Sequence, residues 1–148
     1  MMKSTLLVVE DDEAILHLID VALTMSYYKV IKAKTGREAD FRIRTEHPDI
    51  ILLDLGLPDI DGLSLIKRLR ECVDTPIIVI SARTEEETIV KALDYGANDY
   101  MTKPFNIDEL QARISVALRV SKRPDTMQNN FENVPIINDF IGYTVYMM

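Results

Sequence analysis

The clearest hydrophobic pattern in the chain is a set of short apolar runs, each of which stops at a polar residue. Three of these runs cover residues 5–9, 49–53 and 77–80. They are too short for free-standing helices and have no polar face, so they predict strands buried on both sides of a parallel sheet. A more polar run at residues 28–33 and a short one at 98–101 predict two further strands.

Between these strands, apolar residues recur at helical spacing. Asp12 is a plausible N-cap for the first helix, and Gly96 ends the fourth. Strands that alternate with helices, without connections suited to hairpins, predict an α/β fold with right-handed crossovers. The predicted helices lie near residues 13–25, 37–46, 62–69, 85–95 and 108–120.

Polar residues whose side chains can bind ligands or take part in catalysis follow the predicted strands. Glu10 and Asp11 follow the first strand, Asp54 the third, Ser81 the fourth, and Lys103 the fifth. The carboxyl ends of parallel strands meet at one edge of a sheet, where ligands bind. Carboxylates brought together there repel one another unless a cation lies among them, and Mg²⁺ suits a site with few carboxylates and room for phosphate.

Composition narrows the class of protein. The chain has 148 residues, 47% of them hydrophobic, and a formal net charge of −7, which predicts one globular domain and disfavours nucleic-acid binding by these residues. No segment is typical of a signal peptide or a membrane span. Cys72 is the only cysteine, which favours a cytoplasmic location, and His17 and His47 show no metal-ligand spacing.

Four motifs carry a resemblance to a known family. From residue 6 to about 119, the chain resembles the receiver domain of a bacterial two-component response regulator, most closely the OmpR/PhoB-type transcription regulators. The resemblance implies a doubly wound (βα)5 flavodoxin-like sandwich with a five-stranded parallel sheet in the order 2-1-3-4-5, in a domain spanning residues 1–121. The motifs are Val-Val-Glu10-Asp11, Leu-Leu-Asp54-Leu-Gly-Leu-Pro58 followed by Asp61-Gly62, Ile-Ser81-Ala82-Arg83, and Asp-Tyr100-Met-Thr-Lys103-Pro104-Phe105.

The resemblance also implies a role for each residue at the strand ends. Asp54 matches the phosphoacceptor nucleophile, which takes a phosphoryl group from a sensor histidine kinase. The chain then catalyses its own phosphorylation and dephosphorylation without being a turnover enzyme. Family members hold the Lys103–Pro104 peptide cis. Lys103, the Ser81 hydroxyl and the backbone N–H of Ala82 match the groups that bind the phosphoryl oxygens, while Mg²⁺ (or Mn²⁺) is held by Glu10, Asp11, Asp54 and the carbonyl of Gly56.

The same resemblance implies an output surface made by the fourth helix, fifth strand and fifth helix. On phosphorylation, Ser81 moves toward the phosphate and Tyr100 turns inward from an outward rotamer, which biases this surface. Regulators of this type dimerise there through three charge pairs. In this sequence Asp99 and Arg113 keep one pair, whereas Glu109 faces Ile89, and Asp94 faces Ser115 where a base is usual. Lys91 can only partly replace the missing bases, so we expect a weak or altered dimer.

Two departures from the family pattern concern the phosphoryl site. Serine at position 81 replaces the more usual threonine, which keeps the hydroxyl but loses a methyl group. Gly56, two residues after the acceptor, offers no side chain above the phosphate. We therefore expect water to reach the acyl phosphate easily and the phosphorylated state to be short-lived.

Residues 122–148 form a polar linker and a short apolar tail that is too small for a core of its own. Regulators of this type bind DNA through a winged-helix domain after the linker. Either the chain is truncated at the start of such a domain, or it ends in an atypical tail. If it is truncated, residues 134–148 should be mobile or pair with a neighbouring chain.

Three other functions fit parts of the pattern. A Mg²⁺-dependent phosphatase would carry a second aspartate just after the nucleophile, where Leu55 and Gly56 stand. A flavodoxin-like cofactor protein would need a phosphate-binding loop after the first strand, where Glu10 and Asp11 would repel phosphate. The remaining alternative is a phosphate-independent pseudo-receiver that acts as an interaction module.

Overall fold

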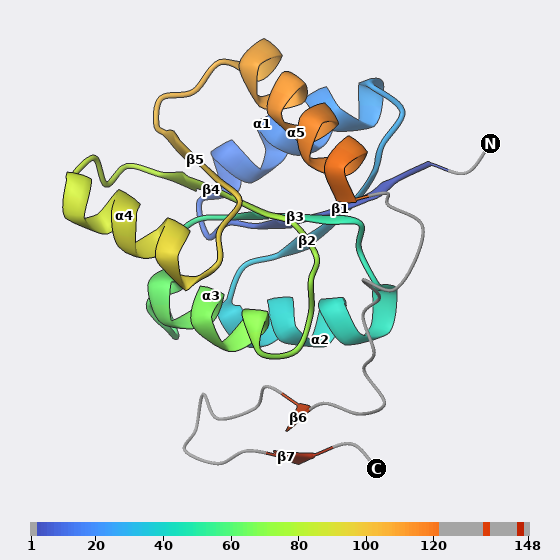
Figure 1. Ribbon diagram of the computed structural model, residues 1–148. Coiled ribbons are helices and arrows are strands. Elements are labelled where there is room, and N and C mark those ends of the chain that lie inside the picture. Colours follow the sequence, from blue (N-terminus) through green and yellow to red (C-terminus); the bar gives the residue numbers. More distant parts are fainter. Residues whose placement is uncertain (1–2, 122–134, 137–144, 147–148) are drawn as a thin grey trace.

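A five-stranded parallel sheet forms the centre of the molecule (Figure 1). The computed structural model describes residues 3–121, 135–136 and 145–146. The strands of the sheet are β1 (Thr5–Val9), β2 (Lys29–Ala33), β3 (Ile50–Leu53), β4 (Ile77–Ser81) and β5 (Asp99–Thr102). The helices between and after them are α1 (Glu13–Met25), α2 (Gly36–Glu46), α3 (Gly62–Arg70), α4 (Glu86–Tyr95) and α5 (Ile107–Ser121).

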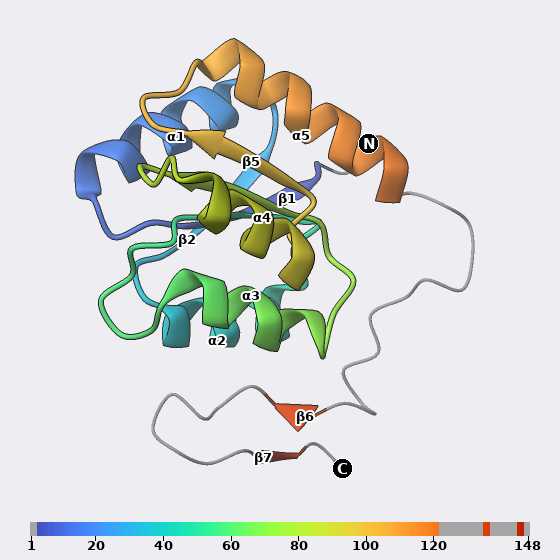
Figure 2. The ribbon, with the colours of Figure 1, turned by 60° about the vertical axis from the view of Figure 1, so that its left-hand side comes forward.

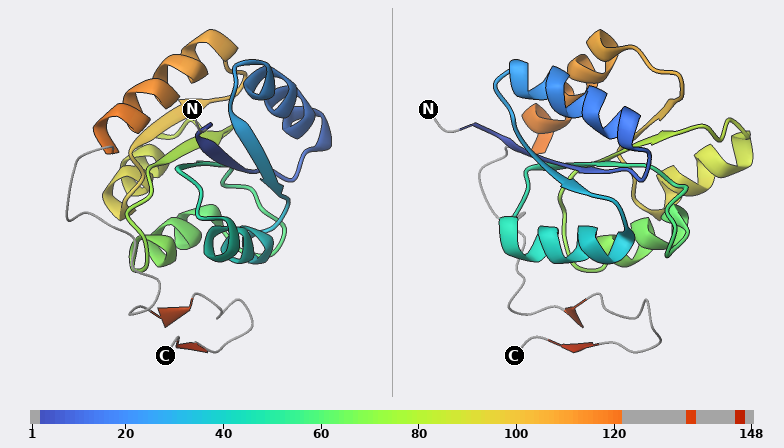
Figure 3. Two further views of the ribbon diagram at one scale, coloured as in Figure 1. Left: turned by 90° about the vertical axis from the view of Figure 1, so that its right-hand side faces the viewer. Right: turned by 180° about the vertical axis from the view of Figure 1, so that it is seen from behind.

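The sheet has the strand order β2-β1-β3-β4-β5, with every neighbouring pair parallel, as predicted. Helices α1 and α5 cover one face, and α2, α3 and α4 cover the other (Figures 1 and 3). The apolar runs explain this sandwich, because alternate residues of one strand point to opposite faces. In β1, Leu6 and Val8 pack with α1 and α5, while Leu7 and Val9 pack on the other side.

The starts of α1 and α5 are fixed by side chains that accept hydrogen bonds from free backbone N–H groups. Asp12 caps α1, as predicted, and accepts from the N–H groups of Ala14 and Ile15 at 2.9 and 3.2 Å. The α5 helix begins at Ile107, one residue before the predicted start, because the Asn106 side chain accepts from the N–H of Glu109 at 3.1 Å.

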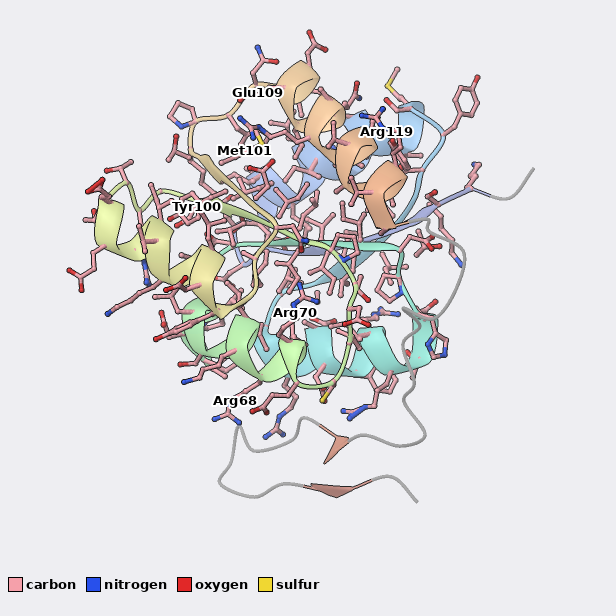
Figure 4. The ribbon with its side chains drawn as sticks, in the orientation of Figure 1. Arg68, Arg70, Tyr100, Met101, Glu109 and Arg119 are labelled. Carbon is pink, nitrogen blue, oxygen red and sulfur yellow. The ribbon has the colours of Figure 1, made fainter. Side chains whose placement is uncertain are left out.

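Arg70, the last residue of α3, joins three segments at the edge of the sheet away from the strand carboxyl ends (Figure 4). Its guanidinium donates to the carbonyls of Gly96 (2.7 and 3.2 Å), Val73 (2.9 Å) and Thr75 (2.9 Å), and to Asn98 Oδ1 (3.2 Å). Burial lowers the pKa of Arg70, and Asp74 opposes that shift. Arg70 therefore fixes the turns before β4 and β5.

Replacing Arg70 with methionine is expected to lower the free energy of unfolding by about 2 kcal/mol, because partly buried carbonyls lose their donors. Urea denaturation measures the change. Arg37→Met, which removes the same charge from an exposed position of α2, is the control and should change stability by less than about 0.5 kcal/mol. Equal stabilities for the two variants would contradict this role for Arg70.

Two short strands follow the sandwich in the sequence. β6 (Pro135–Ile136) and β7 (Val145–Tyr146) pair antiparallel with each other. The linker expected from residue 122 onward lies outside the described residues. Of the tail expected at residues 134–148, only the residues of β6 and β7 are described.

Candidate functional site

The carboxyl ends of β1, β3, β4 and β5 bring the predicted site residues to one edge of the sheet. Glu10 directly follows β1 and is 3% exposed, and Asp54 directly follows β3. Ser81 ends β4 and is buried, while Lys103 directly follows β5. The parallel register makes this arrangement, since Val9 pairs with Leu53 and Ser81 pairs with Thr102.

Lys103 lies between two carboxylates at this edge. Its Nζ is 2.9 Å from Glu10 Oε1 and 3.4 Å from Asp54 Oδ1. Burial disfavours the ammonium, but Glu10 and Asp54 outweigh that effect and raise the pKa of Lys103. Lys103 is therefore charged at neutral pH. The peptide between Lys103 and Pro104 is cis, as expected.

Glu10 is held on both of its oxygens. Oε1 accepts from Lys103, and Oε2 accepts from the backbone N–H of Asp12 at 3.0 Å. Burial raises the pKa of Glu10, and the charge of Asp54 adds to the rise, while the hydrogen bonds from Lys103 and Asp12 oppose it. The hydrogen bonds from Lys103 and Asp12 therefore only partly offset the rise in the pKa of Glu10.

The acidic side chains do not converge as a preformed metal centre. Among the described residues, no group of three or more histidine, cysteine, aspartate or glutamate side chains lies close enough to hold an ion. Asp11 is exposed, and the ammonium of Lys103 separates Glu10 from Asp54. The donors nevertheless fit a hard divalent cation. They are carboxylate oxygens, and Lys103 balances only one of the three negative charges that Glu10, Asp11 and Asp54 carry when ionised.

The loop between β4 and α4 connects Ser81 to Tyr100. Ser81 Oγ accepts from the backbone N–H of Arg83 at 3.1 Å, which leaves the hydroxyl proton free to be donated. Tyr100 Oη donates to the carbonyl of Arg83 at 2.8 Å. Tyr100 is therefore turned inward in this structure. Figure 4 labels it beside Met101, which packs on the other face of the sheet.

Ala82 and Gly56 complete the predicted set. Ala82 is exposed and directly follows Ser81, so its backbone lies at the same edge. Gly56 is paired with Asp61 by an isolated β-bridge. A Cβ built on Gly56 would lie 3.7 Å from Asp54 Oδ2, so a side chain at position 56 would lie next to the predicted acceptor.

On the face formed by α4, β5 and α5 (Figure 2), two of the acids predicted for a dimer, Asp99 and Glu109, contact Arg113 of the same chain. Arg113 Nη1 lies 2.8 Å from both carboxylate oxygens of Asp99, and Arg113 Nη2 lies 2.9 Å from Glu109 Oε2. Lys91 pairs with Glu87 at 3.3 Å, and Ile89 is half-buried. These ion pairs therefore form within a single molecule, without a dimer partner.

A groove of about 510 Å³ lies at the opposite edge of the sheet from Asp54. Its walls include the turns before β3 and β4 and the second half of α5, with Pro48, Pro76 and Val116 among its lining residues. None of the predicted strand-end residues lines it, so the cluster around Asp54 remains the candidate site.

Two residues outside the predicted set also contact the site's loops. The side chain of Arg83 forms an ion pair with Asp61, which precedes α3. Both residues belong to the sequence motifs, but a surface arginine and an N-cap aspartate are ordinary at such positions. Their pairing could not be predicted from the sequence because it depends on how the two loops approach each other.

The fold, with an acceptor-like aspartate and a lysine at the strand ends, matches known proteins. Residues 6–115 match the family model described as the response regulator receiver domain, and the chain belongs to this family. Receiver domains in general bind Mg²⁺ at this acidic pocket.

Curated relatives and solved structures agree with this assignment. The chain is 57% identical over 139 residues to the transcriptional regulatory protein KdpE of Staphylococcus aureus, covering 94% of this chain and 60% of that protein. It is 47% identical over 116 residues to the KDP operon transcriptional regulatory protein KdpE of Escherichia coli, covering 78% of this chain and 52% of the relative. The chain thus spans little more than half the length of these relatives.

The receiver domain of the Francisella response regulator 1452 superposes with a TM-score of 0.78 at 36% identity, covering 81% of this chain and 100% of that chain. Among the described residues, no helix is both long and apolar enough to span a bilayer.

Proposed function

We propose that this chain is the phosphoacceptor part of a two-component response regulator, in which Asp54 takes a phosphoryl group from a sensor histidine kinase. The observation that carries the proposal is the position of Lys103, whose ammonium lies 3.4 Å from Asp54 Oδ1. A phosphoryl group on Asp54 would bring its oxygens within reach of this cation. Membership of the receiver family supports the same chemistry.

In the reaction, an Asp54 oxygen forms a bond to phosphorus while the bond from phosphorus to the kinase imidazole nitrogen breaks, and the imidazole leaves with the electron pair. Phosphoryl transfer depends on in-line positioning and on neutralising the equatorial oxygens. Lys103 pairs with one oxygen. The Ser81 hydroxyl, with its proton free, and the N–H of Ala82 bind another.

The residues that would hold a Mg²⁺ or Mn²⁺ ion are Asp11, Asp54 and the Gly56 carbonyl, with Glu10 acting through water. A bound ion supplies the positive charge that neutralises the phosphoryl oxygens. The pocket's own share is to place Asp54 at a strand end and to keep Lys103 charged beside it.

The output surface is the face formed by α4, β5 and α5, which Tyr100 biases from its position between the Arg83 carbonyl and the core. We propose that phosphorylation promotes a homodimer through this face. Exposed Val90, Leu93 and Val116 give it apolar area. This area offsets the two charge pairs that are lost because Ile89 and Ser115 stand where bases are usual. In a longer protein with a DNA-binding domain, this dimer would control transcription. In this proposal the chain catalyses its own phosphorylation and is not a turnover enzyme.

The experiment that tests the proposal is the intact mass of the protein after incubation with acetyl phosphate and Mg²⁺, alongside Asp54→Ala. The expected result is a gain of one phosphoryl group that requires both Mg²⁺ and Asp54. Absence of any adduct, together with no change in the NMR spectrum on adding beryllofluoride, would favour the phosphate-independent interaction module instead.

The lifetime of the phosphorylated state depends on Gly56. Its backbone is not in the left-handed region, so other residues fit there, and their side chains would project beside Asp54 Oδ2. Gly56→Asn is expected to slow hydrolysis of the acyl phosphate about threefold to tenfold, because the side chain obstructs the attacking water. The loss of phosphorylated protein over time by intact mass measures this rate. A variant that hydrolyses faster than the parent would refute this account of Gly56.

A further inference from the structure

Arg83 contacts both residues through which phosphorylation of Asp54 is expected to change the output surface. Its backbone N–H donates to Ser81 Oγ at 3.1 Å, and its carbonyl accepts from Tyr100 Oη at 2.8 Å. The backbone position of this one residue therefore determines whether Ser81 is held and whether the inward Tyr100 has an acceptor.

The side chain of Arg83 extends in another direction. Its Nη2 lies 3.1 Å from Oδ1 of Asp61, the residue before α3. Asp61 stands at an N-cap position, yet its side chain makes no capping hydrogen bond, so its carboxylate is used for Arg83. Asp61 is also bridged to Gly56, two residues after the acceptor. The Arg83–Asp61 pair thus joins the loop that begins at Asp54 to the loop that holds Tyr100.

We propose that Arg83 is a positioning residue, and that the Arg83–Asp61 pair favours the inward position of Tyr100 by fixing the backbone to which its hydroxyl bonds. This inference rests on the proposed function, in which Tyr100 reports the state of Asp54. The side chains of Arg83 and Asp61 are 39% and 45% exposed, so the pair is a weak bias rather than a lock. An exposed ion pair of this kind changes an equilibrium about twofold to fivefold.

The test follows Tyr100 directly, by fluorine NMR of protein labelled with 3-fluorotyrosine, with the Tyr100 signal assigned through Tyr100→Phe. The variants are Arg83→Ala, Asp61→Ser, which keeps a good N-cap residue, and the double variant. Lys32→Ala, which breaks the exposed Lys32–Asp20 pair at 2.9 Å on β2, is the control. Each protein is titrated with beryllofluoride and Mg²⁺ to saturation.

In the free protein, each single variant is expected to shift the ratio of inward to outward Tyr100 about twofold to fivefold toward outward. Because coupling is reciprocal, the beryllofluoride concentration at half saturation should rise by a factor no larger than that shift. The double variant should match the single variants, since both remove the same pair. The control should behave as the parent.

Single variants with the parent's Tyr100 signal, or additive effects in the double variant, would overturn the role of the pair while leaving the proposed function intact. A parent whose Tyr100 signal ignores saturating beryllofluoride would overturn the Tyr100 switch and this inference together. Intact-mass measurement of the adduct on Asp54 separates that result from a failure of phosphorylation itself.

Discussion

Replacing Lys103 with methionine is expected to slow phosphorylation of Asp54 by acetyl phosphate about a hundredfold. The substitution keeps an unbranched side chain of similar length and removes the only cation within 3.4 Å of Asp54 Oδ1 among the described residues. Loss of one oxyanion-hole donor costs on the order of 10²–10³ in rate, and Lys103 has the same charge-stabilising role at the phosphoryl oxygens. The rate is measured by intact mass over time at saturating Mg²⁺.

The control for this prediction must remove a lysine charge without touching the pocket. Lys32→Ala does so on β2, where the lysine pairs with Asp20 at the surface. That variant should be phosphorylated at the parent's rate. If Lys103→Met were phosphorylated as fast as Lys32→Ala, the ammonium would have no part in the transfer.

The Lys103 substitution is also expected to change the pKa of Glu10 and, through it, the stability of the folded state. Without Lys103, Glu10 keeps only the N–H of Asp12 as a hydrogen-bond partner shown by the structure. Burial already raises the pKa of Glu10 and Lys103 opposes that rise, so removing the lysine is expected to raise it further. The folded state of the variant should therefore be disfavoured as pH rises above the ordinary value of about 4.5 for this carboxyl group.

The backbone of this site could be predicted from sequence because few patterns are compatible with a doubly covered parallel sheet. Strands buried on both faces must be apolar along their whole length, so residues 50–53 and 77–80 stand out, and their ends are marked by Asp54 and Ser81. The strand ends then bring the polar residues together without any knowledge of side-chain contacts.

The direction of each side chain could not be predicted in the same way. The sequence predicts carboxylates gathered around a cation, but the structure shows the ammonium of Lys103 between Glu10 and Asp54. Arg70 ends an amphipathic helix, where an arginine is ordinarily a surface residue, yet its partner Gly96 lies 26 positions later in the sequence. Such contacts depend on the distance between loops, which hydrophobic periodicity does not encode.

Replacing Gly62 with alanine is expected to lower the free energy of unfolding by about 3 kcal/mol. A Cβ at position 62 would lie 2.4 Å from the Cα and 2.9 Å from the carbonyl oxygen of Leu55, which is fully buried. The N–H of Gly62 also donates to that carbonyl at 2.9 Å, so helix and loop are held in contact. The clash is with backbone, and neither segment can relieve it by a rotamer change.

Helix propensity predicts the opposite sign, because alanine is favoured over glycine in a helix by up to about 1 kcal/mol. The matched control is Gly56→Ala, whose Cβ has its nearest neighbour, Asp54 Oδ2, at 3.7 Å and should be tolerated. Urea denaturation of both variants decides between close packing and propensity. Since Leu55 directly follows Asp54, displacing it should also slow phosphorylation of Gly62→Ala, whereas a variant as stable as the parent would show that α3 can move away from the acceptor loop at little cost.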